Sequence, residues 1–503
     1  MNHERAAAII GALVPTVEHV AVCPGSRSTP LALAAAHHPD LHVHVVLDER
    51  SAGFWAVGVA RAMGRPAAII TTSGTAVANL HPAVVEADAA ALPMVVLTAD
   101  RPADLRGTGA NQTIDQVGLF GRHARAHADL DGDDVRPLLE AAMASCPGPV
   151  QVNVPFDEPL TPDAPLPDPR RGTDVAASPR TTPPRTVLEG RGLIVAGPGP
   201  VTLDQAARIE AAARRLQAPI LADPLSGLDG VWCQDAVLAA PPAALRPDWV
   251  VQFGHTPVSK RLNAWLRDHP RRHRIDPTGR RWDEGEPVWI DGDPADVLEA
   301  ATGGEMWDAW PRAQNAMPSD APAEVEALRQ VLARPGTVFV GNSLPIRDLD
   351  RFLPRRRDVF ANRGASGIDG NLATAAGLSV GGPVTAIVGD LTFQHDVGGL
   401  ALVAERDVRV VVIRNGGGQI FRHLPIADAT EHFESLFVTP QRFDIAAACA
   451  AFGVSHEAAA PGEVGAALAR SRVVEVVVDG PSSAAARDAA THAMVAAARA
   501  ALP

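Results

Sequence analysis

Two strand-like runs near the end of the chain lead directly into residues that can bind a metal ion and a phosphate. The run 384–388 is followed by Gly389 and Asp390, and the run 408–413 leads to Asn415 and three glycines. About 25 residues separate Asp390 from Asn415, which leaves room for one crossover helix and one strand. Carboxylate and amide oxygens suit Mg²⁺, and glycines let the backbone approach a diphosphate closely. We expect a metal and phosphate site here; the alternative is a helix-capping aspartate beside a Gly-rich turn.

Polar, charged and glycine residues follow other apolar runs in the same way. These loops are residues 24–30, 48–50, 72–75, 100–102, 342–343 and 362–367. Open parallel sheets bind ligands beyond the carboxyl ends of their strands. Loops of this kind near both ends of the chain therefore indicate one shared site.

The elements that must position these loops alternate between short Val/Ile-rich runs and Ala-rich stretches, which is typical of parallel sheets with crossover helices. The runs interpreted as strands are 19–23, 43–47, 67–71, 94–98, 150–154, 192–197, 220–224, 250–254, 288–291, 338–340, 359–361, 384–388, 408–413 and 473–478. Prolines cluster between residues 155 and 184, and a polar, Pro-containing segment lies around 317–322. We predict an α/β fold of three tandem domains, each with a mainly parallel sheet flanked by helices. The predicted boundaries are 1–160, a linker at 161–187, then 188–315 and 323–503.

Length and composition agree with this organisation and exclude several classes. A chain of 503 residues corresponds to roughly three domains. Its net charge of −13 is unfavourable for nucleic-acid or anionic-membrane binding, and no apolar run is long enough to span a bilayer. The four cysteines form no CxxC pair, so we expect buried thiols in a reducing cytosol. The sequence predicts a soluble, cytoplasmic protein with no nucleic-acid or membrane partner.

Two histidine-containing segments receive structural interpretations. His42 and His44 alternate with valines and are expected on one face of a strand, with no catalytic role. The segment His269–Arg274 is strongly basic but lacks interleaved aromatic residues, so it is expected to form an exposed basic loop.

The Asp390–Asn415 pattern resembles the magnesium and diphosphate motif of thiamine diphosphate enzymes, whose domain order is pyrimidine-binding, central and diphosphate-binding. Within that superfamily the chain is most similar to the 2-succinyl-5-enolpyruvyl-6-hydroxy-3-cyclohexene-1-carboxylate synthases of menaquinone biosynthesis. The runs that carry this likeness are Cys23–Pro30, Thr72–Leu80, Leu97–Pro102, Gly109–Gln112, Asn362–Gly370 and Gly417–Phe421. In the middle domain only Lys260 and Arg261 share it.

The resemblance implies the cofactor thiamine diphosphate and a divalent ion, Mg²⁺ or Mn²⁺. Glu49 would hydrogen-bond the aminopyrimidine ring and promote the tautomer that accepts a proton. Asp390, Asn415 and the backbone oxygen of Gly417 would hold the metal, and Ile368 would bend the cofactor. The further cofactor-binding residues it implies are Ser73, Gly74, Gly389, Leu391, Gly418, Gln419 and Ile420. Leu391 and Arg414 depart from the superfamily motif, where glycine and asparagine are usual.

The resemblance also implies a carboligase that decarboxylates 2-oxoglutarate and adds the carbanion to isochorismate. Both substrates carry two carboxylates, which planar guanidinium groups bind well. The implied substrate-binding residues are Ser26, Arg27, Arg101, Asn111, Gln112, Lys260, Arg261, Ser343, Arg347, Arg363, Phe421 and Leu424. Of these, Arg27, Ser343, Arg347 and Arg363 are expected to act in catalysis with Glu49. Lys260 is the only lysine in the chain. The superfamily further implies a homodimer or homotetramer.

Two alternatives remain open at this point. Another thiamine diphosphate enzyme, such as an acetolactate synthase-like carboligase or a 2-oxoacid decarboxylase, would use the same cofactor residues with fewer carboxylate-binding arginines. A catalytically inactive nucleotide-binding or regulatory protein could also have this fold, although the presence of both Glu49 and Asp390 disfavours it.

Overall fold

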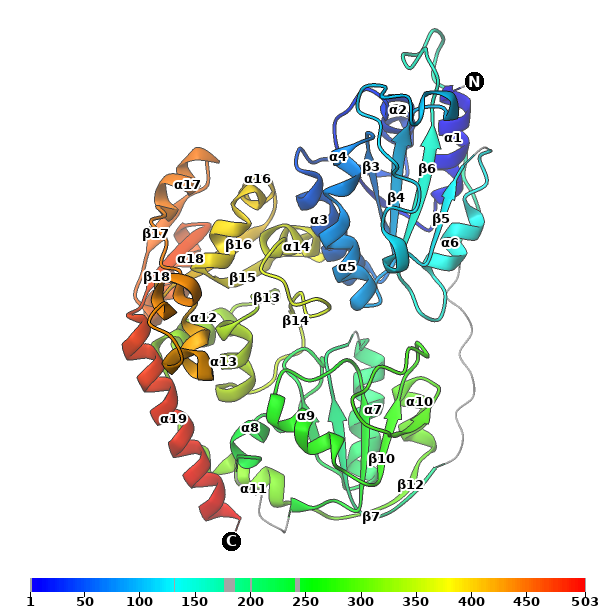
Figure 1. The fold of residues 1–503 in the computed structure, drawn as a ribbon. Helices are drawn as coiled ribbons and strands as arrows, with labels where there is room; N and C mark the ends of the chain where they lie inside the picture. The colour runs from blue at the N-terminus through cyan, green and yellow to red at the C-terminus, as the bar shows by residue number, and fades with distance from the viewer. Residues whose placement is uncertain (1, 131, 176–185, 200, 240–244, 503) are drawn as a thin grey trace. The chain divides into compact units, whose positions relative to one another are not determined.

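The computed structural model describes residues 2–130, 132–175, 186–199, 201–239 and 245–502 (Figure 1). Contacts divide the chain into two units. The first comprises Met1–Pro179, Asn362–Pro383 and Asp396–Val408, and the second comprises Arg180–Ala361, Val384–His395 and Arg409–Pro503. Part of the predicted linker, residues 176–185, lies outside the described residues, so the predicted domain boundaries stay predictions.

The first unit contains a parallel six-stranded sheet with the order β2-β1-β3-β4-β6-β5. Its strands are β1 (His19–Val22), β2 (His42–Val45), β3 (Ala67–Thr71), β4 (Met94–Asp100), β5 (Ala126–Asp129) and β6 (Pro149–Pro155). The helices of this part are α1 (Asn2–Leu13), α2 (Thr29–His37), α3 (Glu49–Met63), α4 (Thr75–Ala78), α5 (His81–Ala89) and α6 (Arg136–Ala142). β3 and β4 are buried along their whole length because they are central, whereas β2 is an edge strand with exposed ends.

The second unit contains two further sheets. The first of them has the order β11-β10-β9-β7-β12, with β8 paired to β7, and all these pairs are parallel. Its strands are β7 (Val187–Ala196), β8 (Ile220–Ala222), β9 (Trp249–Phe253), β10 (Arg272–Ile275), β11 (Val288–Ile290) and β12 (Thr302–Glu305). Its helices are α7 (Leu203–Arg215), α8 (Gln234–Val237), α9 (Lys260–Arg267), α10 (Pro294–Ala300) and α11 (Ala309–Asn315).

The last sheet has the order β14-β13-β15-β16-β18-β17. Its strands are β13 (Thr337–Val340), β14 (Val359–Phe360), β15 (Val384–Gly389), β16 (Val408–Arg414), β17 (His456–Ala458) and β18 (Val473–Val477). Its helices include α12 (Ala323–Leu332), α13 (Leu344–Phe352), α15 (Asp390–His395), α17 (Ile445–Ala451), α18 (Val464–Arg470) and α19 (Gly480–Ala501). Three mainly parallel sheets flanked by helices confirm the predicted fold class.

The expectation of an exposed basic loop at His269–Arg274 is wrong. Arg272 and Arg274 lie in strand β10, and they are only 4% and 6% exposed. Two nitrogens of Arg272 donate to the two carboxylate oxygens of Asp283, each at 2.6 Å. A bidentate pair of this kind lets a guanidinium be buried inside a sheet.

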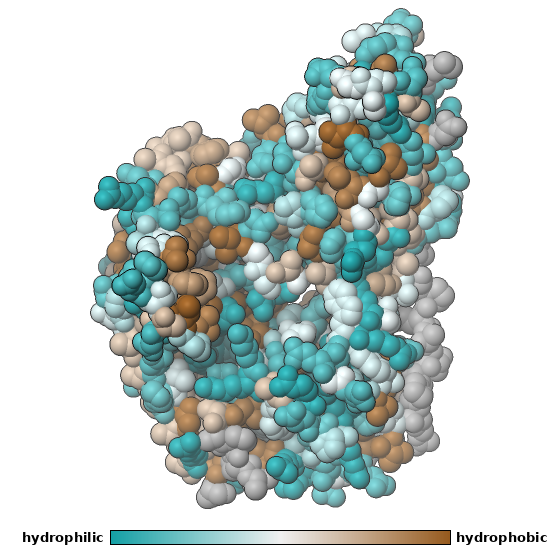
Figure 2. Space-filling view, viewed as in Figure 1, coloured by the Kyte–Doolittle hydropathy of each residue, from teal (hydrophilic) through white to brown (hydrophobic). Residues whose placement is uncertain are grey.

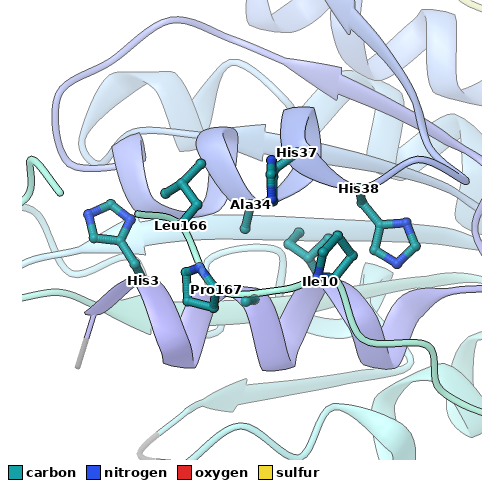
Figure 3. Close-up of a pocket in the computed structure, with 9 residues that line it drawn as sticks. His3, Ile10, Ala34, His37, His38, Leu166 and Pro167 are labelled. Carbon is teal, nitrogen blue, oxygen red and sulfur yellow. The ribbon is translucent and has the colours of Figure 1, made fainter. Parts of the chain in front are cut away.

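Residues 161–175, the first part of the predicted linker, form no helix or strand but lie in part against α1 and α2. Pro167 lines a small pocket together with Ile10 of α1 (Figure 3). His38 follows α2, and its Nε2 lies 2.7 Å from the carbonyl oxygen of Arg170. This stretch is therefore packed onto the first unit.

All four cysteines are free thiols. Cys23, Cys233 and Cys449 are buried as expected, whereas Cys146 is only partly buried. Burial raises the pKa of Cys233 to about 12 and that of Cys449 to about 11. These two thiols therefore stay protonated near neutral pH.

Among the described helices, none is both long and apolar enough to cross a membrane. On the face of the molecule seen in Figure 2, hydrophilic and hydrophobic residues are intermixed.

Three histidines of the first sheet form a stacked cluster. The His19 ring stacks on His42 and on His44, with centroids 5.1 and 5.3 Å apart, so His42 and His44 share one face as expected. Arg406 donates to Nδ1 of His44 at 2.8 Å, which leaves Nε2 of His44 to donate its proton to His19 at 3.0 Å. Burial first, and then Arg406, lowers the pKa of His44 from 6.5 to about 3.

We predict that His44 makes the protein less stable as the pH falls from 6.5 toward 3. In that range the unfolded chain binds a proton at His44 and the folded protein does not, so the free energy of unfolding rises with pH. His44→Gln should reduce the proton uptake on unfolding near pH 5 by about one. Denaturation curves between pH 4 and 7 measure this, with the exposed His37→Gln as control. An unchanged pH dependence in His44→Gln would remove His44 as the cause.

Helix α3 packs closely against α14 (Asn371–Leu378) in the first unit (Figure 1). A Cβ atom on Gly58 would lie 2.1 Å from the carbonyl oxygen of Thr374, and one on Gly377 would lie 2.0 Å from that of Trp55. The two helix backbones therefore leave no room for a side chain at either glycine. The hydroxyl of Thr374 donates to the carbonyl oxygen of Phe54 at 3.2 Å, which adds a polar contact across the same interface.

Gly58→Ala should destabilise the protein by about 1–3 kcal/mol, because the new methyl group can only be accommodated by moving backbone atoms. Gly465→Ala in α18 is the matched control, since its Cβ would meet only the amide oxygen of Gln330 at the end of a flexible side chain. We expect that variant to be neutral or slightly stabilised. Thermal unfolding of both variants tests the contact, and equal midpoints would contradict it.

Candidate active site

Glu49 is the first residue of α3, which begins shortly after the end of β2 at Val45. The Asp48 side chain caps the helix by accepting from the backbone N–H of Arg50 at 3.0 Å and from the hydroxyl of Ser51 at 2.9 Å. Asn79 donates to Oε2 of Glu49 at 3.3 Å. The following residues, 51–60, are all buried, so α3 holds this half-buried carboxylate on a rigid support.

Four sequence-predicted residues of the first unit meet at the ends of β3 and β4. The hydroxyl of Ser73 donates to the carbonyl oxygen of Gln112 at 2.8 Å, and the Gln112 amide donates back to that of Ser73 at 2.9 Å. Arg101 donates to the hydroxyl of Ser73. The backbone N–H of Gly74 donates to the side chain of Gln116 at 3.1 Å. The structure thus brings Ser73, Gly74, Arg101 and Gln112 together.

Arg27 is close enough to Arg101 to affect its pKa. Burial first, and then Arg27, lowers the pKa of Arg101. One nitrogen of Arg27 donates to the carbonyl oxygen of Phe156 at 2.9 Å, and another lies 3.3 Å from the Glu158 carboxylate. Two neighbouring guanidinium groups in an acidic chain form a suitable environment for carboxylates.

Ser26 and Asn111 are the two remaining residues predicted in this part of the unit. Both are exposed, and they lie on the loops that also carry Arg27 and Gln112. Their side chains are therefore accessible to a ligand.

A buried polar network under these loops was missed by the sequence analysis. Asn153 donates to Asp100 at 3.0 Å, and Gln116 donates to Asn153 at 2.7 Å. Gln151 donates to the carbonyl oxygen of Gln116 at 2.7 Å. Gln151 and Asn153 alternate with valines in β6, and polar residues at every second position of a buried strand could have revealed this network. Because Gln116 binds Gly74, the network fixes the loop after β3.

The loop with Arg363 and Ile368 is held by a buried carboxylate in the first unit. Glu86 accepts from the backbone N–H groups of Gly364 and Ala365 at 2.9 and 2.7 Å. Gly370 has a positive φ of 63°, and a Cβ there would overlap the Phe54 ring at 1.9 Å. Ile368 remains partly exposed on this loop, and Arg363 is half-buried.

In the second unit, Asp390 opens α15 directly after Gly389, the last residue of β15. Its Oδ2 accepts from the backbone N–H groups of Gly416 and Gly417, both at 3.0 Å, and its Oδ1 accepts from Leu391 at 2.8 Å. Burial raises the pKa of Asp390, which a bound cation would oppose. β15 and β16 are neighbours in the sheet, so the two motif halves meet as the spacing predicts.

The glycine loop after β16 is shaped as a close-fitting turn. Gly416 and Gly417 have positive φ values of 82° and 115°, and a Cβ on Gly417 would lie 2.1 Å from the carbonyl oxygen of Val438. Asn415 is buried beside them. A carboxylate, an amide and glycine carbonyls are hard oxygen donors, so these residues fit a magnesium and diphosphate site.

Arg414, which departs from the superfamily motif, is directed toward β18. It donates to Glu475 at 2.8 Å, and Nε2 of His456 contacts the other oxygen of Glu475 at 3.0 Å. Arg414 is therefore engaged in an ion pair of the sheet.

The segment Gln419–His423 forms a short 3-10 helix after the glycine loop. It carries the buried Gln419 and the half-buried Ile420 and Phe421. The Phe421 ring lies 5.6 Å from that of Phe437, edge to face, and the partly exposed Leu424 follows. Ile420, Phe421 and Leu424 thus lie on one short segment after the glycine loop, and their expected role as an apolar wall stays a prediction.

The four remaining predicted substrate-binding residues lie at or near the starts of two helices of the second unit. Ser343 has a positive φ of 73° and precedes α13, and Arg347 donates back to its carbonyl oxygen at 2.7 Å. Lys260 and Arg261 are the first residues of α9, and both are exposed.

The chain matches three family descriptions along its length. They are "Thiamine pyrophosphate enzyme, N-terminal TPP binding domain" at residues 3–119, "Middle domain of thiamine pyrophosphate" at 173–288 and "Thiamine pyrophosphate enzyme, C-terminal TPP binding domain" at 347–482. The fold resembles a putative thiamin diphosphate-dependent enzyme from Mycobacterium smegmatis, with a TM-score of 0.70 and 20% identity over 94% of this chain and 99% of that one. It also resembles benzoylformate decarboxylase from Polynucleobacter necessarius, with a TM-score of 0.72 and 17% identity over 94% and 98% of the two chains. The fold and the family matches define a thiamine diphosphate-dependent enzyme.

Comparison with curated relatives identifies one family within this class of enzymes. A 2-succinyl-5-enolpyruvyl-6-hydroxy-3-cyclohexene-1-carboxylate synthase from Chloroflexus aurantiacus is 42% identical over 86% of this chain and 84% of its own length. Synthases of the same name from Bacillus velezensis and Halobacterium salinarum are 39% and 41% identical and cover 88% and 87% of this chain, and 87% and 88% of their own lengths. The chain belongs to the family of 2-succinyl-5-enolpyruvyl-6-hydroxy-3-cyclohexene-1-carboxylate synthases.

Proposed function

We propose that this synthase joins 2-oxoglutarate and isochorismate in menaquinone biosynthesis, with thiamine diphosphate and Mg²⁺ or Mn²⁺. One C–C bond of 2-oxoglutarate breaks and releases CO₂, a new C–C bond forms to isochorismate by 1,4-addition, and the adduct takes up one proton. The observation that carries this proposal is the pair Arg27 and Arg101. Two neighbouring guanidinium groups at strand ends of a chain with net charge −13 suit dicarboxylate substrates.

Glu49 acts on the cofactor in this proposal. Thiamine diphosphate, when bound, supplies the electron sink for decarboxylation. The Glu49 carboxylate would hydrogen-bond the aminopyrimidine ring and hold a proton there. Its support is the Asp48 cap and the buried body of α3, which keep the carboxylate in one place.

Asp390, Asn415 and the carbonyl oxygen of Gly417 would hold the divalent ion. The backbone N–H groups of Gly416 and Gly417 orient the Asp390 carboxylate. A bound cation would favour the charged form of Asp390, which burial disfavours. Ser73, Gly74, Gly389, Leu391, Gly418, Gln419, Ile420 and Ile368 would line the rest of the cofactor.

The substrates would bind to the cationic and polar side chains around this cofactor. Arg101 would hold a carboxylate of isochorismate, together with Asn111 and Gln112 on the neighbouring loop. The other groups proposed for the two substrates are Ser26, Arg27, Lys260, Arg261, Ser343, Arg347 and Arg363, with Phe421 and Leu424 as apolar contacts. Of these, Arg27, Ser343, Arg347 and Arg363 would touch the reacting atoms.

We further propose that the enzyme is a homodimer or homotetramer. Val45 and Leu47 are 66% and 85% exposed, and they lie four and two residues before Glu49. Apolar side chains this exposed beside a proposed cofactor carboxylate suit a protein–protein contact.

Glu49→Gln should lower turnover by orders of magnitude, because an amide keeps the size of the side chain but cannot support the required tautomer. Steady-state product formation measures this loss, and thermal stabilisation by thiamine diphosphate shows that the cofactor still binds. Glu140→Gln on the surface of α6 is the matched control. Activity of Glu49→Gln within a few-fold of the unmodified enzyme would remove Glu49 from the mechanism.

Arg101→Ala should impair the reaction with isochorismate more than the decarboxylation of 2-oxoglutarate. Loss of a buried bidentate arginine contact costs about 2–5 kcal/mol, so isochorismate-dependent product formation should fall at least about 30-fold. Decarboxylation of one equivalent of 2-oxoglutarate on the enzyme should survive, and Arg101→Lys should rescue poorly. The exposed Arg136→Ala serves as control. If Arg101→Ala abolishes that first decarboxylation and leaves the KM for isochorismate unchanged, Arg101 binds the other substrate.

A further inference from the structure

The first turn of α9, which carries Lys260 and Arg261, is anchored by a buried hydroxyl. Ser259 caps the helix by accepting from the backbone N–H of Leu262 at 3.2 Å. The same hydroxyl donates to Oδ1 of Asp235 in α8 at 2.8 Å. Because both Ser259 and Asp235 are buried, the start of α9 is fixed to α8 by this bond.

The other oxygen of Asp235 binds two guanidinium groups. Arg261 donates to Oδ2 at 3.1 Å and to the Asp235 carbonyl oxygen at 3.2 Å. A nitrogen of Arg351 lies 3.2 Å from the same Oδ2. Arg351 is in α13, one turn beyond Arg347, so one carboxylate connects the two helices that carry Lys260, Arg261 and Arg347.

Asp235 is buried, whereas its partner Arg261 remains accessible to solvent, as expected for a residue that binds a ligand. Asp235 is 6% exposed, whereas the side chain of Arg261 is 47% exposed. A guanidinium has five N–H donors, and the contacts to Asp235 use only one of its nitrogens. Among the described residues Arg261 has no other hydrogen-bond or ion-pair partner, so its remaining donors can bind a planar carboxylate in a fixed orientation.

A second buried carboxylate, Asp350, lies near Asp235. Its neighbour Gln234 donates to Asp350 at 3.0 Å, and Arg355 donates to the same oxygen of Asp350 at 2.8 Å. Burial, with additions from Asp223 and Asp235, raises the pKa of Asp350 to about 7. Asp235 is the member of this cluster that contacts a proposed substrate residue.

We propose that Asp235 is a positioning residue for a substrate carboxylate. It orients the Arg261 guanidinium and, through Ser259, the first turn of α9. This inference rests on the proposed function, because it needs Arg261 to bind one of the two substrates. A positioning role differs from a purely structural role in one respect. Substitution of Asp235 should change substrate binding only when Arg261 is present.

The test compares Asp235→Asn, Asp235→Ala, Arg261→Ala and the double variant Asp235→Ala/Arg261→Ala, with both substrate KM values and kcat measured for each. Asp293→Asn is the matched control: Asp293 is also buried, caps α10 of the same sheet and accepts from Gln205 at 2.5 Å. Thermal unfolding shows which variants are folded. Asp235→Asn keeps the size and one acceptor oxygen, so it provides the test if Asp235→Ala does not fold.

We expect Arg261→Ala to raise one substrate KM and Asp235→Ala to raise the same KM about tenfold, with kcat within about twofold. Asp235→Asn should raise it less, and Asp293→Asn should not raise it. In the Arg261→Ala background, removal of Asp235 should add little, since the pair acts as one unit. An unchanged KM in a folded Asp235 variant, or fully additive effects in the double variant, would overturn the inference. Failure of the proposed function would appear earlier, as absence of isochorismate-dependent product with the unmodified enzyme.

Discussion

Carboxylates that accept consecutive backbone N–H groups hold the loops on which the site depends. Glu86 binds Gly364 and Ala365 in the first unit, and Asp390 binds Gly416 and Gly417 in the second. Such bonds offset the penalty of burying a charge and fix a loop that has no regular hydrogen bonds of its own. In both loops the bonded pair includes glycine, which lets the backbone lie close to the carboxylate.

The proposed substrate-binding arginines are also held in place by hydrogen-bonded partners. The chain is acidic overall, yet arginines concentrate at strand ends and helix starts where substrate carboxylates are proposed to bind. Each has a partner that sets its direction: Ser73 for Arg101, the carbonyl oxygen of Phe156 for Arg27, and Asp235 for Arg261. Pre-oriented guanidinium groups lose less freedom on binding than flexible surface arginines, and this favours specific recognition of carboxylates.

Much of the fold could be predicted from the sequence because parallel strands buried on both faces appear as continuous apolar runs. The juxtaposition of Asp390 with the glycine loop followed from the same rule. Strands with charged or small residues, such as β5 and β10, were missed, and Arg272 was misplaced in an exposed loop. Its partner Asp283 lies in a separate loop, and no local pattern reveals that pairing. The anchoring roles of Glu86 and Asp235 likewise depend on contacts between residues far apart in the chain, whereas the role of Glu49 came from family resemblance alone.

In the proposed reaction, decarboxylation and carbon–carbon bond formation occur in one enzyme with two dicarboxylate substrates. The most direct measurement is CO₂ release from 2-oxoglutarate, with and without isochorismate, alongside quantification of the adduct. We predict sustained CO₂ release only when isochorismate, thiamine diphosphate and a divalent ion are all present, with one adduct formed for each CO₂. Equally fast CO₂ release without isochorismate, giving the simple aldehyde, would contradict the proposed reaction and identify a 2-oxoacid decarboxylase.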